Sequence, residues 1–295
     1  MTDTIRTIGG GDPVAAFEAA RDAARRAKRL QTAAGAVLFG LAIAASVHIG
    51  EVRIDTFVEG LPGFVNYLND IAPVLRPGHL AGDLAEWYWA FPRWLGLLWD
   101  TVLIAFAGTL LGGVGALVFC FPASRNLMPR YPVYFVARRL TEIARAVPEL
   151  VYALIFVFAF GLGPLAGVLA IAVHTAGALG KLFAEVNENV DPKPIEGVIA
   201  AGGDWFQMIR YAVIPQVLPN YTSYGLLRFE INVRGAAVIG FVGAGGIGQE
   251  LMFVIREFIY TDVSALVLMI VAAVVCIDIS CEKLRHYLIG QEGLS

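Results

Sequence analysis

The stretch "RFEINVRGAAVIGFVGAGGIGQELMFVI", residues 228–255, decides between two fold classes. Gly243, Gly245 and Gly248 spell G-x-G-x-x-G, an apolar run precedes them, and Asp262 follows at a suitable distance. Taken alone, this pattern is typical of dinucleotide-binding domains, in which glycines let a pyrophosphate approach the N-terminus of a helix. It raises the hypothesis of a nicotinamide-dependent protein.

The composition of the whole chain argues against a soluble fold. Of the 295 residues, 57% are hydrophobic, and the mean hydropathy is +0.67. Only 16% of the residues are charged, whereas soluble domains usually have roughly 25%. A dinucleotide-binding domain also needs further βαβ units, but here another apolar stretch begins near Val263. The chain is therefore predicted to be an all-α polytopic membrane protein.

About six apolar segments are long enough to cross a membrane as helices. The third and fourth are separated by "GLGP", residues 161–164, because Gly and Pro together mark a turn. Basic residues cluster in 13–29 and 282–290, which places both termini in the cytoplasm. The predicted spans are roughly 30–49, 97–121, 131–161, 164–187, 215–240 and 263–282.

Three regions follow from these spans. Residues 1–29 are expected to form a cytoplasmic amphipathic segment, and 30–94 the first span with an outer polar segment. Residues 95–290 form the core domain, which includes an inside loop at 190–215. The first span has an alternative interpretation as a cleaved signal peptide, although its basic region is long for one.

The inside loop contains "DPKPIEGVIAAGGDWFQMIRYAVIPQVLP", residues 191–219. Its prolines, followed by Glu196 in the first turn, predict the start of a helix. Gly202 and Gly203 are expected to break that helix. An apolar stripe is predicted from Ile195, Ile199, and Phe206 or Met208.

This spacing resembles the cytoplasmic loop of ABC-importer membrane subunits, E-A-A-x-x-x-G followed after nine residues by I-x-L-P. Glu196, Gly202 and Pro215 fall in register. The departures are Gly197 and Val198 for the two alanines, Ala212 for the isoleucine and Ile214 for the leucine. With "RAVPELVYALIFVFAFGLGP" and "RFEINVRGAAVIGFVGAGGIG", the region of roughly 95–290 is similar to the permease of phosphonate/phosphite ABC importers, whose fold is like that of methionine-importer permeases.

The resemblance implies the membrane subunit of an ATP-driven importer for phosphonate or a related phosphorus oxyanion. The expected partners are a second copy, two cytosolic ATPase subunits and a periplasmic or lipid-anchored binding protein, in the membrane lipid of the bacterial inner membrane. ATP and Mg would belong to the ATPase subunits, because this chain lacks G-x-x-x-x-G-K-[ST]. Neither a catalytic residue nor a metal site is expected in this chain, and it is not expected to be an enzyme. The predicted ATPase-coupling residues are Ile195, Glu196, Ile199, Ala200, Ala201, Gly202, Phe206 and Pro215.

Charged residues inside the predicted spans are expensive unless they pair or line an aqueous path. One hypothesis is that they border the path of an anion, and the other is that they are structural pairs. Pairs at i, i+4 are predicted for Glu230 with Arg234, Arg228 with Asn232, and Arg145 with Glu149. The predicted pathway or gate residues are Glu149, Arg228, Glu230, Asn232, Arg234, Gly243, Gly245, Gly246 and Gly248, the glycines forming a looped backbone near an outer gate.

Other functions remain open on the residues alone. A permease of the same fold could carry methionine or another oxyanion, and a secondary transporter would be driven by ions instead of ATP. The inside loop has its own alternative interpretation as an ordinary amphipathic interfacial helix between two spans. The net charge of −3 gives no indication of nucleic-acid binding.

Overall fold

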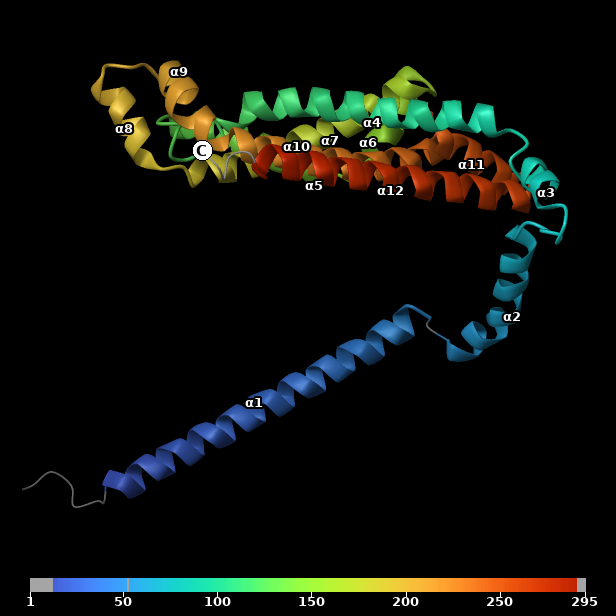
Figure 1. The fold of residues 1–295 in the computed structure, drawn as a ribbon. Helices are drawn as coiled ribbons and strands as arrows, with labels where there is room; N and C mark the ends of the chain where they lie inside the picture. The colour runs from blue at the N-terminus through green and yellow to red at the C-terminus, as the bar shows by residue number, and fades with distance from the viewer. Residues whose placement is uncertain (1–12, 52, 291–295) are drawn as a thin grey trace, which may run out of the picture. The chain divides into compact units, whose positions relative to one another are not determined.

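The structure is a computed structural model that describes residues 13–51 and 53–290. The chain divides between Tyr67 and Leu68 into two compact units. Every regular element of the described ranges is a helix (Figure 1). The predicted all-α class is therefore confirmed, while the expected cytoplasmic ends of the chain, 1–12 and 291–295, lie outside the described residues.

The first unit consists of α1, Pro13–Ile49, and most of α2, Ile54–Ile71. α1 is one helix of 37 residues, which contains both the described part of the predicted amphipathic segment and the predicted first span at 30–49. The physical reason is local, because alanine and long straight side chains favour a helix and no glycine interrupts it before Gly35. The basic segment and the first span thus form one continuous helix, whose length is about 55 Å at 1.5 Å per residue.

The second unit contains the remaining helices, and its long helices run side by side (Figure 1). α4 and α7 pack closely because glycines of α4 face α7. A Cβ added to Gly108 would collide with Ile171, and one added to Gly112 with Thr175. The small size of these two residues therefore permits the close approach of the two helices. The elements are α3 Leu80–Trp87, α4 Phe91–Cys120, α5 Tyr131–Ala146, α6 Glu149–Phe160, α7 Pro164–Glu188, α8 Pro192–Ala200, α9 Trp205–Met208, the π-helix η1 Ile209–Val213, α10 Ile214–Ile239, the 3-10 helix η2 Gly240–Val242, α11 Ile247–Arg256 and α12 Tyr260–Gly290.

The second unit has two distinct ends, which Figure 1 shows apart. We call the end with α8 and α9 the α8 end, and the end with α3 and α11 the α11 end. At the α8 end, α9 and η1 pack against the last turn of α4, the end of α7 and the start of α10. At the α11 end, α11 packs against the start of α4 and the first half of α12.

Among the described residues, four helices are long and apolar enough to cross a membrane, and two bent helix pairs raise the number to as many as six. The predicted turn at 161–164 is confirmed, and α7 begins at Pro164. The span expected at 131–161 is a bent helix pair, which adds one span to the count if the pair crosses the membrane as one unit. It consists of α5 and α6, which meet at 88° because Val147, ahead of Pro148, adopts an extended backbone.

Candidate functional site

Capping residues define the helix α8, the first part of the predicted coupling loop. Asp191 caps its N-terminus by accepting a hydrogen bond from the Lys193 N–H at 3.1 Å. Glu196 lies beyond the first turn, so the predicted role as a first-turn acid is wrong. At the other end, the Gly202 N–H donates to the Ile199 carbonyl and the Gly203 N–H to the Val198 carbonyl, both at 2.9 Å. This Schellman pattern requires the left-handed backbone that Gly202 adopts, with φ of +84°.

The apolar side chains of the loop point to two sides instead of forming the one predicted stripe. Ile195 and Met208 pack against the buried cluster of the α8 end. Ile199 and Phe206 are instead exposed, with 56% and 75% of their surface accessible. Ile199 lies in α8, whereas Phe206 follows the reversal at Gly202 in α9, so the exposed apolar side chains come from both helices. The other predicted coupling residues on the surface are Glu196, Ala200, Ala201 and Pro215.

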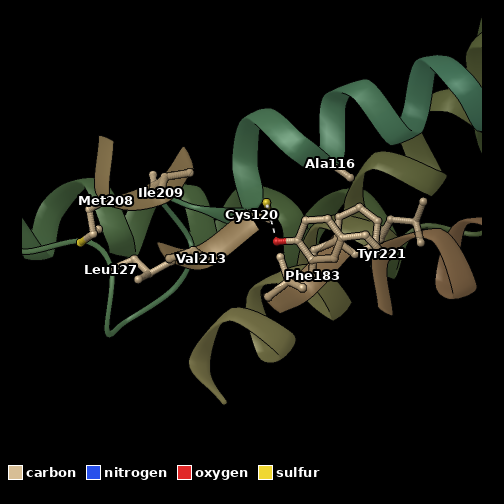
Figure 2. Packing of buried hydrophobic residues seen from close by; sticks show 10 residues of the cluster. Ala116, Cys120, Leu127, Phe183, Met208, Ile209, Val213 and Tyr221 are labelled. Atoms are coloured by element: carbon tan, nitrogen blue, oxygen red, sulfur yellow. Dashed lines mark hydrogen bonds between the residues drawn. The ribbon is translucent and has the colours of Figure 1, made fainter. Parts of the chain in front are cut away.

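Both ends of the loop are fastened to the helix bundle. At its start, Gln216 of α10 accepts from the Asp191 N–H at 3.0 Å and donates to the Asp191 carbonyl at 3.4 Å. Further on, the Trp205 indole N–H donates to the Leu127 carbonyl at 2.8 Å. Between these points, Ile209 and other side chains fill the cluster shown in Figure 2. The loop is therefore anchored to the bundle while it exposes two large apolar side chains.

The first group of buried charges surrounds Arg228 of α10. Its guanidinium lies 3.9 Å from a carboxylate oxygen of Glu149, and its Nε donates a long hydrogen bond of 3.4 Å to Thr175. Within the described part of the chain, that Glu149 oxygen has no hydrogen-bond partner. Asn232 is fully buried and donates to Thr109 and Thr175 at 2.8 and 2.9 Å, instead of pairing with Arg228 as predicted.

The other charges of α10 pair with α12 and not along their own helix. Glu230 accepts from Arg285 at 2.7 Å, and Arg234 donates to both carboxylate oxygens of Asp278 at 3.0 Å. The predicted pair Glu230–Arg234 is therefore wrong, as is Arg145–Glu149, because Glu149 faces Arg228. The two contacts with α12 are charge-assisted hydrogen bonds, which are stronger than hydrogen bonds between neutral groups.

The glycine-rich stretch forms a packed turn between η2 and α11. The Gly243 carbonyl accepts from the Gly163 N–H of the α6–α7 turn at 2.9 Å, and Thr101 of α4 accepts from the Ile247 N–H at 2.8 Å. Asp262, the supposed ribose ligand, instead accepts from the Trp89 indole at 3.2 Å. The glycine turn at the α11 end therefore forms hydrogen bonds with other parts of the protein. This agrees with the prediction that the chain has no dinucleotide-binding fold.

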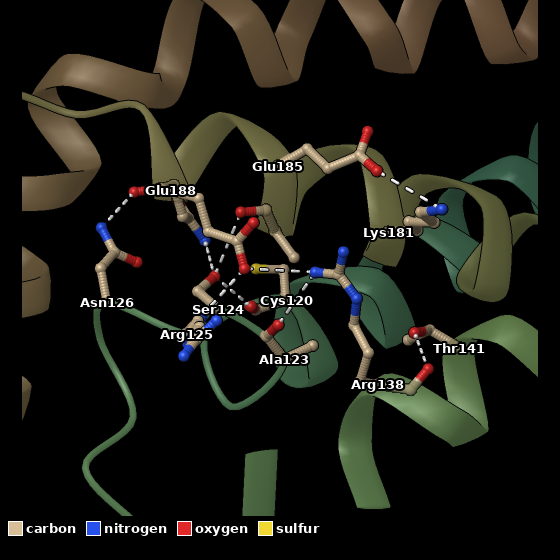
Figure 3. A network of polar contacts seen from close by, with 12 residues as sticks. Cys120, Ala123, Ser124, Arg125, Asn126, Arg138, Thr141, Lys181, Glu185 and Glu188 are labelled. Carbon is tan, nitrogen blue, oxygen red and sulfur yellow. Dashed lines mark hydrogen bonds and ion pairs between the residues drawn. The ribbon is translucent and has the colours of Figure 1, made fainter. Parts of the chain in front are cut away.

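A buried polar network at the α8 end was not predicted from the sequence. Ser124, Asn187 and Tyr221 come from the turn after α4, from α7 and from α10, and are joined by hydrogen bonds. Beside them, Arg138 of α5 pairs with Glu188 at 3.2 Å (Figure 3). Serine, asparagine and tyrosine are common residues here without any motif spacing, so no local signal could have found them.

Long apolar helices, paired charges between them and an anchored amphipathic loop at one end define a polytopic permease subunit. Residues 108–288 match the family described as "binding-protein-dependent transport system inner membrane component", and the chain belongs to this family. The fold is similar to that of a solved inward-facing MetNI methionine ABC transporter, with a TM-score of 0.57, 20% identity and coverage of 66% of this chain and 95% of that chain.

Two curated relatives carry the resemblance further. The phosphite transport system permease protein PtxC of Stutzerimonas stutzeri is 38% identical over 252 residues, which cover 85% of this chain and 87% of PtxC. The putative cryptic phosphonate transport system permease protein PhnE2 of Escherichia coli (strain K12) is 45% identical over 121 residues, 41% of this chain and 99% of PhnE2. The predicted resemblance to phosphonate/phosphite permeases is therefore confirmed.

Proposed function

We propose that this chain is the membrane-spanning subunit of an ATP-driven importer for a phosphorus oxyanion such as phosphite, phosphonate or phosphate. It forms the translocation path in the bacterial inner membrane together with a second copy or a related permease. A binding protein delivers the anion from outside. Two cytosolic ATPase subunits bind ATP and Mg and hydrolyse the nucleotide, so this chain performs no catalysis.

The observation that carries this proposal is the anchored loop from α8 to α9. It exposes Ile199 and Phe206 while its two ends are fastened through Asp191 and Trp205. Large apolar side chains that are exposed on a rigid element can become buried in a groove of a partner protein. Movement of an ATPase subunit that holds this surface would then be passed to α10 without being absorbed by a flexible loop.

Orientation follows from the same assignment. The α8 end faces the cytosol, where the ATPase subunits are, and the glycine turn at the α11 end faces outside as part of an outer gate. The basic residues at the end of α12 are then on the inner side, in agreement with the rule for Arg and Lys. We propose a cytoplasmic N-terminus as well, because basic residues also cluster in 13–29.

Uptake by reconstituted vesicles tests the function. The chain is reconstituted with its ATPase and binding-protein partners, and uptake of phosphite, methylphosphonate, phosphate and methionine is measured. ATP-dependent uptake of a phosphorus oxyanion, with none for methionine, is the expected result. Uptake by the chain alone without ATP, or uptake of methionine only, would contradict it.

Arg228 is the best-suited residue for transient contact with the anion. Its guanidinium has five N–H donors, yet the contacts described are one hydrogen bond of 3.4 Å and a carboxylate at 3.9 Å. A phosphorus oxyanion can accept two parallel hydrogen bonds from such a group. Glu149 would compete with the anion for Arg228 and so keep the anion from being trapped.

A pair of matched substitutions separates this role from a structural one. Arg228→Gln is expected to lower uptake at least tenfold while the ATPase subunits still copurify. Arg234→Gln removes a guanidinium already paired with Asp278, so it should lower thermal stability but leave uptake per folded complex near normal. Equal effects of the two substitutions on uptake would remove Arg228 from the path.

A further inference from the structure

A chain of buried hydrogen bonds joins three helices at the α8 end. Tyr221 of α10 donates from its hydroxyl to the Asn187 Oδ1 at 2.6 Å. Asn187 of α7 donates from its Nδ2 to the Ser124 Oγ at 3.1 Å, and Ser124 donates to the Cys120 carbonyl of α4 at 2.7 Å. Ser124 and Asn187 are fully buried, and Tyr221 is 7% exposed. Hydrogen bonds in such surroundings are expensive to leave unmade, so they fix the three helix ends relative to one another.

Packing fixes the Tyr221 ring as firmly as its hydroxyl. The ring stacks on Phe183 of α7, with 3.9 Å between the centroids and 15° between the planes. The hydroxyl also lies 3.5 Å from the Cys120 Sγ, and Figure 2 shows both contacts within one cluster. α10 therefore has one defined rotation about its axis at this level.

The same asparagine is connected to the loop. Asn126, in the turn after α4, donates from its Nδ2 to the Asn187 carbonyl at 2.7 Å. The next residue, Leu127, accepts the indole hydrogen bond of Trp205 in α9. The main-chain carbonyl of Asn187 therefore binds the turn that is attached to α9. The side chain of Asn187 binds Tyr221 of α10.

We propose that Asn187 and Tyr221 are positioning residues that form a transmission joint between the α8–α9 loop and α10. Movement imposed on Trp205 reaches Asn187 through the turn at 126 and 127, and Tyr221 converts it into rotation of α10. Arg228 lies seven residues further along α10, two turns away on the same face. The joint therefore couples the loop to the pathway residue, and this inference rests on the function proposed above.

Replacement of Tyr221 by phenylalanine tests the joint, because the ring can still stack on Phe183 and only the hydroxyl is lost. In vesicles with ATPase and binding protein, Tyr221→Phe is expected to keep ATP hydrolysis but to lower oxyanion uptake per ATP at least fivefold. Tyr224→Phe is the matched control, one turn along α10, because the Tyr224 hydroxyl makes no hydrogen bond with any described residue. The control should keep the uptake per ATP of the unaltered chain.

A second variant distinguishes positioning from stability. Tyr221→Phe combined with Asn187→Leu replaces both hydrogen-bonding partners by apolar groups, a change that can be nearly neutral for stability. We expect this double variant to regain the unfolding temperature of the unaltered complex but not its uptake per ATP.

Three results would overturn the joint. They are unchanged uptake per ATP in Tyr221→Phe, recovery of uptake together with stability in the double variant, and failure of both variants to fold, which would make the pair a structural anchor. Absence of ATP-driven uptake in the unaltered complex is a different failure, because it overturns the proposed function itself.

Discussion

The two glycine-rich turns of the second unit lie at opposite ends and use glycine for different reasons. Gly202, at the α8 end, has a φ of +84°, but a Cβ added there would meet nothing within 4 Å. At the α11 end, Gly246 has a φ of +76°, and a Cβ there would also collide with Thr101. Gly202 supplies only a backbone conformation, whereas Gly246 supplies conformation and space.

The difference distinguishes an open surface, which a partner protein could contact, from a turn packed inside the helix bundle. The space around Gly202 is open, so another protein can lie against the reversal between α8 and α9. The space around Gly246 and Gly248 is already filled by α4 and α10. The dinucleotide-like spacing of the glycine turn is therefore explained by helix packing, and none of its glycines is left free to approach a ligand phosphate.

Gly248→Ala is expected to have the largest effect. The added methyl group would collide with the Ala237 carbonyl in the backbone of α10, which cannot move aside as a flexible side chain would. We expect a loss of about 3 kcal/mol of stability from overpacking, measured as thermal unfolding of the purified complex in detergent. Gly113→Ala is the control, because a Cβ there meets nothing within 4 Å. Equal stability of the two variants would show that the α11 end is not packed as described.

Gly202→Ala should have an intermediate effect, about 1–2 kcal/mol for an L-residue in the left-handed region. The fold should survive while the reversal between α8 and α9 changes shape, so copurification of the ATPase subunits should fall. Gly197→Ala is the matched control: it lies within α8 in open space, needs no left-handed backbone, and should stabilise the helix slightly. If the two substitutions reduce copurification equally, the shape of the reversal does not determine the binding of the ATPase subunits.

Phe206→Ala should have the smallest effect on stability, within about 0.5 kcal/mol for a mostly exposed side chain. Its expected effect is on assembly, measured as at least tenfold weaker binding of the ATPase subunits. Ile195→Ala, on the inward side of the same loop, should show the opposite pattern, with lower stability and smaller loss of binding. Unchanged ATPase binding by Phe206→Ala would contradict the assignment of this surface.

Sequence predicted those parts of the fold that depend on local chain chemistry. The prediction of a turn at 161–164 was correct, because Gly161 and Gly163 adopt positive φ and Pro164 begins α7. The segment 131–161 was predicted as one span, but the chain turns by 88° between α5 and α6 at Pro148. Proline restricts the residue before it, yet the angle depends on how α5 and α6 each pack against α7.

Sequence could not predict contacts between distant segments. Glu230 pairs with Arg285, 55 residues away, and no periodicity along α10 identifies that partner. Similarly, Asn187 and Tyr221 become neighbours only when α7 and α10 pack. The helix start and the glycine break of the loop at 190–215 were predicted because both signals are local, whereas the division of its apolar residues between two sides depends on the bundle beneath it.

The π-helix Ile209–Val213 carries a consequence for the angular setting of the whole loop. A π turn contains one residue more than an α turn, and each residue of an α-helix advances the chain by about 100° around the axis. Phe206 lies just before this extra residue, and Tyr221 lies after it. The π turn therefore sets the angle about the axis of α10 at which α9 departs from it. An unbroken α-helix over the same residues would place Phe206 roughly a quarter of a revolution away from its present direction, with every side chain of the loop unchanged.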